Sequence, residues 1–90
     1  MHNRIKLTVK SVAGNCAAGY KVGDHFFIDN GLWIVPGEPP RFCIYALPAL
    51  IPYLTAYCRE TPDSDWINRK MELACPDNKN AVIFGLERVG

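Results

Sequence analysis

Four cysteines are the residues of this chain best suited to chemistry: Cys16, Cys43, Cys58 and Cys75. None belongs to a Cys-x-x-Cys pair, so neither a zinc ribbon nor a thioredoxin-type redox motif is present in the sequence. Any shared site must therefore be assembled by the fold. Three thiolates brought together could hold a zinc ion or an iron–sulfur cluster, with a fourth position left to water, His25 or a substrate. The alternative is that small, apolar cysteines simply fill the core.

Cys43 is the best single candidate for a reactive thiolate. It precedes a predicted helix, and the free N–H groups and positive dipole end of a helix N-terminus stabilise a thiolate. Arg41 would add to this effect if it folds back, whereas burial against Phe42, Ile44 and Tyr45 would raise the pKa of the thiol. The sequence shows no base for such a nucleophile, so it leaves open whether the protein is an enzyme.

Composition indicates one folded domain over residues 1–90. The chain is 49% hydrophobic, and its ten basic and nine acidic side chains give a formal charge of +1. This balance argues against a basic face for nucleic acid. The longest apolar run, 42–58, contains prolines and is shorter than the ~20 residues that a membrane span needs. We expect a cytoplasmic protein with reduced cysteines and no disulfide.

Alternating hydrophobicity predicts strands on both sides of a central apolar segment. Residues 4–12 alternate cleanly, and residues 70–75 and 81–89 do the same around a turn at 76–80, which predicts an antiparallel hairpin. A strand over 20–28, interrupted at Gly23, and a short strand over 32–35 are expected between them. The proline-rich segment 36–40 predicts a loop.

The apolar segment 43–60 is the one helix candidate of normal length. Because Pro52 would cost ~3 kcal/mol in a helix interior, we expect a helical turn over 43–47, a kink, and a main helix over about 49–59. A single turn is expected around Trp66. Trp33 and Trp66 are expected in the core, the commoner outcome in a chain this small, and the alternative is that an exposed tryptophan marks a partner surface. The order of elements predicts an α+β fold, a small antiparallel sheet with one main helix packed across its apolar face.

Three groups of residues stand out by their order and spacing. They are Cys16-x-x-Gly19-x-x-x-Gly23-Asp24 followed by Phe26; Phe42-Cys43 opening an apolar helix that contains Pro52; and Cys75-Pro76-Asp77 before the closing strand Val82-x-Phe84 with Arg88. Together they resemble a widespread family of prokaryotic proteins of similar length and unassigned function. The resemblance spans nearly the whole chain and implies that Cys16, Cys43 and Cys75 occupy the family's characteristic cysteine positions, whereas Cys58 is peculiar to this chain. The chain departs from the family at Tyr20, where many relatives carry His.

Three hypotheses of function follow. In the first, Cys16, Cys43 and Cys75 converge on a metal, cluster or small-ligand site, with Cys58 outside it. In the second, the chain is a structural or partner-binding module with inert cysteines, and in the third it is a small thiol enzyme that uses Cys43. A homo-oligomer is also expected, because the apolar runs 26–28 and 32–35 exceed what one helix can cover.

Overall fold

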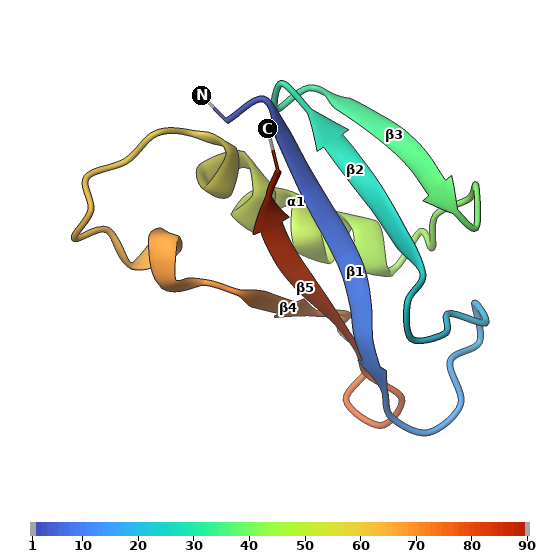
Figure 1. Ribbon diagram of the computed structural model, residues 1–90. Helices are drawn as coiled ribbons and strands as arrows, with labels where there is room; N and C mark the ends of the chain where they lie inside the picture. Colours follow the sequence, from blue (N-terminus) through green and yellow to red (C-terminus); the bar gives the residue numbers. More distant parts are fainter. Residues whose placement is uncertain (1, 90) are drawn as a thin grey trace.

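The computed structural model describes residues 2–89, in which one helix lies across an antiparallel sheet (Figure 1). The strands are β1 (Arg4–Val12), β2 (His25–Asp29), β3 (Trp33–Glu38), β4 (Glu72–Ala74) and β5 (Val82–Arg88), and the helices are α1 (Ala46–Cys58) and the 3₁₀ helix η1 (Trp66–Arg69). Across the sheet the order is β3-β2-β1-β5-β4, with every neighbouring pair antiparallel. The predicted α+β class is confirmed. Within residues 2–89 no helix combines the length and apolar character needed to cross a membrane.

The two central strands supply most of one wall of the core. β1 pairs with β2 on one side and with β5 on the other. Because side chains alternate along a strand, every second residue of each strand faces α1. These buried residues are Ile5, Leu7, Val9, Val82, Phe84 and Leu86. The alternation predicted for both strands is therefore confirmed.

α1 covers this buried face of the sheet (Figure 1). Its buried residues are Ala46, Leu50, Leu54, Tyr57 and Cys58. The helix is continuous over 46–58, so the predicted break before a main helix starting at 49 is wrong. Pro52 is exposed, and water can satisfy the carbonyl group that loses its N–H partner there. Pro48 stands in the first turn, where a missing N–H costs nothing.

The second and third strands differ from their predicted bounds. β2 begins after a turn in which Gly23 has a φ of 97° and the Asp24 carboxylate accepts a hydrogen bond from the Lys21 N–H at 2.8 Å. That turn removes residues 20–24 from the predicted strand. β3 extends over 33–38 and includes Pro36, where a loop was predicted. Pro36 is exposed on an edge strand, so its missing N–H interrupts no central ladder.

The C-terminal elements agree with their predictions, but the tryptophans do not. The single turn at Trp66 is η1, and the Asp65 carboxylate caps it by accepting a hydrogen bond from the Ile67 N–H at 3.0 Å. β4 and β5 form the predicted antiparallel hairpin. Trp33 and Trp66 are 67% and 57% exposed, so the expectation of core tryptophans is wrong. Trp33 lies on an edge strand, and aliphatic and phenylalanine side chains fill the core instead.

Arg88 at the end of β5 joins three elements. Its guanidinium donates to the Tyr57 carbonyl oxygen from Nε at 3.2 Å and from Nη2 at 3.0 Å, and to Asn68 Oδ1 at 2.9 Å. The guanidinium carbon also lies 4.1 Å from the centroid of the Tyr57 ring. Since α1 has no basic residue in its last turn, Arg88 supplies the cation that a helix C-terminus favours.

Candidate functional site

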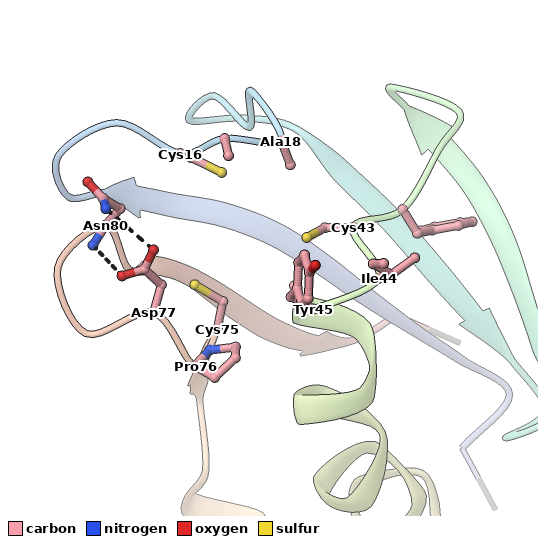
Figure 2. A pocket seen from close by; sticks show the side chains of 12 residues that line it. Cys16, Ala18, Cys43, Ile44, Tyr45, Cys75, Pro76, Asp77 and Asn80 are labelled. Atoms are coloured by element: carbon pink, nitrogen blue, oxygen red, sulfur yellow. Dashed lines mark hydrogen bonds between the residues drawn. The ribbon is translucent and has the colours of Figure 1, made fainter.

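A pocket of about 670 Å³ lies where the β1–β2 loop, the segment before α1 and the β4–β5 turn meet (Figure 2). Each of these segments contributes one cysteine to its lining: Cys16, Cys43 and Cys75. In Figure 2 their sulfur atoms face the same space. All three are free thiols and are partly exposed. Three cysteines that are distant in sequence therefore border one cavity.

The rest of the pocket lining is mainly apolar. It consists of Ala17, Ala18, Phe42, Ile44, Tyr45, Ala46, Pro76, Asp77 and Asn80. Among these described residues Asp77 is the single charged side chain, and none is Lys, Arg or His. A pocket of this composition suits an uncharged or cationic ligand better than an anion.

Asn80 fixes the loop that carries Cys16. Its Oδ1 accepts a hydrogen bond from the Asn15 N–H at 2.8 Å. The Cys16 carbonyl in turn accepts a hydrogen bond from the Gly19 N–H at 3.0 Å, which closes a tight turn. Gly14 permits the close approach of Asn80, because a Cβ atom at this glycine would collide with Asn80 Oδ1. These contacts tie the β1–β2 loop to the β4–β5 turn.

The β4–β5 turn positions Cys75 and Asp77. The Cys75 N–H donates to the Val82 carbonyl at 3.0 Å, and the Cys75 sulfur accepts a hydrogen bond from the Val82 N–H at 3.2 Å. The Asp77 carboxylate accepts hydrogen bonds from the N–H groups of Lys79 at 2.9 Å and Asn80 at 3.0 Å. These bonds hold the pKa of Asp77 below its usual value. Asp77 is therefore ionised at neutral pH.

Cys43 is anchored on both sides of its peptide unit. Its carbonyl accepts a hydrogen bond from the Leu47 N–H at 3.1 Å. Because α1 begins at Ala46 with Tyr45 as its N-cap, Cys43 precedes the helix and does not occupy its N-terminus, where the sequence had placed it. Its own N–H donates to the Tyr20 hydroxyl oxygen at 3.0 Å. The Tyr20 ring packs edge-on against Phe84, with centroids 5.5 Å apart. Burial raises the pKa of Tyr20, and the Cys43 N–H partly opposes this effect.

Cys58 and His25 lie outside the pocket lining. Cys58 ends α1 and is 2% exposed in the core. Burial raises the pKa of its thiol, and the charge of Arg88 opposes that rise. His25 Nδ1 lies 3.2 Å from the Gly23 carbonyl oxygen, and the His25 ring packs edge-on against Phe27. Neither residue contributes a side chain to the cavity of the other three cysteines.

Within residues 2–89, no group of three or more His, Cys, Asp or Glu residues is placed to hold a metal ion. The zinc or iron–sulfur site at Cys16, Cys43 and Cys75 therefore stays a prediction, which would require the three segments to rearrange on binding.

Comparisons of the chain with family models, with curated proteins and with solved structures gave no match. The family resemblance noted from sequence thus stays a prediction, and the site rests on its own geometry.

Two residues of the site were not identified from sequence. Asn80 was assigned only to a turn, and Tyr20 was noted only as a departure from the family pattern. Their roles depend on hydrogen bonds across 65 and 23 residues of sequence, to Asn15 and Cys43 respectively. The spacing Asp77-x-x-Asn80 is the available signal for the first, because an aspartate side chain commonly accepts hydrogen bonds from N–H groups two or three residues on.

Proposed function

We propose that this protein binds a small thiol-seeking ligand in the pocket lined by Cys16, Cys43 and Cys75. The observation that carries the proposal is the meeting of these three thiols, from three separate segments, on one cavity. Cys58, in contrast, is enclosed in the core. Partly exposed thiols are available to ligands, whereas enclosed thiols mainly pack. This contrast supports a binding site over the alternative of inert packing.

The lining favours a soft ligand without negative charge. Thiolates prefer soft metal ions and soft electrophiles to hard, oxygen-seeking cations. Ionised Asp77 at the cavity disfavours anions. The cavity volume exceeds what one metal ion fills, so an organic ligand matches the space better than a single zinc ion. The proposal requires reduced thiols, and these persist in a reducing compartment such as the cytoplasm, the location expected from the sequence.

Titration with phenylarsine oxide tests this proposal. This trivalent arsenical is soft and uncharged, and it binds neighbouring thiols. The reduced wild-type protein should bind it stoichiometrically, as measured by intact-mass spectrometry under native conditions. Single substitutions Cys16→Ser, Cys43→Ser and Cys75→Ser replace a soft sulfur by a hard oxygen, so each should lower the affinity by about tenfold or more.

Cys58→Ala is the matched control, because it removes a thiol that lies outside the pocket. It should keep the arsenical affinity of the wild type while lowering the melting temperature. Equal losses from all four substitutions, in proportion to melting temperature alone, would contradict a binding site. The metal content of anaerobically purified protein completes the test, because stoichiometric zinc or iron would identify the resident ligand as a metal or cluster.

We also propose that two copies of the chain associate along β3. This strand is at the edge of the sheet; Trp33, its first residue, is 67% exposed, and Leu32, directly before it, is 79% exposed. Edge pairing across a two-fold axis would cover both. The run 26–28 does not contribute as expected, since Phe26 and Ile28 are buried in their own chain. Light scattering should give a mass above the 10.1 kDa monomer that Trp33→Lys reduces, and a wild-type monomer would contradict the pairing.

A further inference from the structure

A smaller recess of about 200 Å³ adjoins the thiol pocket at Cys43. Its lining residues are Ala18, Tyr20, Pro39, Arg41, Phe42 and Cys43. Cys43 borders both cavities, so a ligand bound in the recess lies beside a residue of the thiol pocket. The recess has room for about seven water molecules at liquid density, which corresponds to a ligand of few heavy atoms.

The polar groups of the recess differ from those of the thiol pocket. The Tyr20 hydroxyl oxygen accepts the Cys43 N–H at 3.0 Å, and no group in the described part of the chain accepts the Tyr20 O–H in turn. Because burial raises the pKa of Tyr20, this hydroxyl keeps its proton at neutral pH. Arg41 adds a positive charge, and no acidic side chain is among the lining residues. The recess thus combines a hydrogen-bond donor and a cation, and it adjoins the pocket that the Cys43 sulfur faces.

We propose that this recess is a carbonyl-binding subsite, in which Cys43 adds to α,β-unsaturated carbonyl compounds while the Tyr20 hydroxyl binds the carbonyl oxygen. The inference rests on the proposed function and deepens it, since it names an electrophile class for one thiol of the same pocket. A donor and a cation beside a thiol suit an electrophile whose oxygen gains negative charge as sulfur attacks. They favour displacement from an alkyl halide less, because its negative charge leaves with the halide and no enolate oxygen forms.

The addition is balanced without an oxidant or reductant. The Cys43 thiol loses its proton to water, and the thiolate sulfur forms a bond to the β-carbon. The π-electron pair of the carbon–carbon double bond moves toward the carbonyl, giving an enolate whose oxygen accepts a hydrogen bond from Tyr20. The α-carbon then takes a proton from water. The product is a thioether in which S–H has been added across the double bond.

Two thiol reagents separate this role of Tyr20 from a merely structural one. N-ethylmaleimide is an α,β-unsaturated imide and forms an enolate, whereas iodoacetamide reacts by displacement of iodide and forms none. Rates of modification at Cys43, Cys16 and Cys75 are measured separately by peptide mass spectrometry on the intact folded chain. In the wild type, the ratio of the maleimide rate to the iodoacetamide rate should be about tenfold higher at Cys43 than at the other two cysteines.

Tyr20→Phe should remove this preference. The maleimide rate at Cys43 should fall about tenfold while the iodoacetamide rate stays within about twofold. Tyr45→Phe is the matched control, because Tyr45 lines the thiol pocket but not the recess, and it should change neither rate. Equal rate ratios at the three cysteines of the wild type, or an equal fall of both rates in Tyr20→Phe, would overturn the inference. Either result leaves stoichiometric arsenical binding intact, so failure here is distinct from failure of the proposed function.

Discussion

Arg88→Met tests how far a single side chain holds the C-terminus of α1 against the sheet. Methionine keeps an unbranched apolar stem of similar length and removes the guanidinium. The substitution therefore deletes three hydrogen bonds to two acceptors, the Tyr57 carbonyl and Asn68 Oδ1, together with the stacking on the Tyr57 ring. Packing of the stem is retained. The loss of stability then reports the polar contacts of Arg88.

The magnitude follows from these contacts. A hydrogen bond to a charged group contributes about 1.5–3 kcal/mol, so two acceptors would give about 3–6 kcal/mol in a fully buried site. Arg88 is only half-buried, which reduces this to about half, and the cation–π contact adds about 0.5–1 kcal/mol. We expect a loss of about 2–4 kcal/mol in the free energy of unfolding. That is a large part of the roughly 5–13 kcal/mol expected for a domain of 90 residues.

Urea denaturation followed by far-UV circular dichroism measures this loss. Arg59→Met is the matched control, because Arg59 directly follows α1 and is exposed. The control should change the free energy of unfolding by less than about 0.5 kcal/mol. The reasoning is refuted if Arg88→Met costs under about 1 kcal/mol, or no more than the control.

Three further comparisons of variants test the pocket and the core. Gly14→Ala and Gly19→Ala both place alanine at positive φ, so each should lower the free energy of unfolding by about 1 kcal/mol. Only the Cβ atom of Gly14→Ala collides with Asn80, so only this substitution should weaken phenylarsine oxide binding. The pKa of Asp77 is lowered on folding, so its stabilisation is present above the unfolded-state pKa of about 4 and is lost as pH falls through the lower folded-state pKa. The denaturation midpoints of wild type and Asp77→Ala should therefore converge on acidification, and a constant difference would contradict this. Cys58→Ser should lower the melting temperature more than Cys58→Ala, because it buries a hydroxyl group; equal melting temperatures would show that the hydroxyl finds a partner.

The alternation of apolar and polar residues predicted strands correctly, because it reports which side chains are buried. Ile5, Leu7 and Val9 alternate with polar residues, and the structure buries all three. The predictions of a loop at Pro36 and of a helix break near Pro52 were wrong, because they did not take the surroundings of each proline into account. Pro36 lies on an edge strand and Pro52 on the exposed side of a helix, and in both places solvent removes most of the usual penalty.

The candidate site was only partly predictable for a different physical reason. Cys16, Cys43 and Cys75 all lie in segments that connect elements, and such segments can be recognised from sequence. The contacts that set their positions are long-range, such as Asn80 to Asn15 and Tyr20 to Cys43. These contacts form only where the sheet brings distant loops together, and a local pattern of residues does not predict which loops meet.

The centre of the sheet pairs β1 with β5, from Ile5 opposite Arg88 to Val12 opposite Val82. During translation β1 leaves the ribosome long before its partner exists. Its edge toward β5 stays unpaired until the last strand emerges, and pairings this distant in sequence form slowly. The thiol pocket also needs the turn between β4 and β5. A nascent chain therefore has neither a complete sheet nor a ligand site until β5 is synthesised, and a chain that stops before β5 leaves an edge of β1 exposed to aggregation and proteolysis.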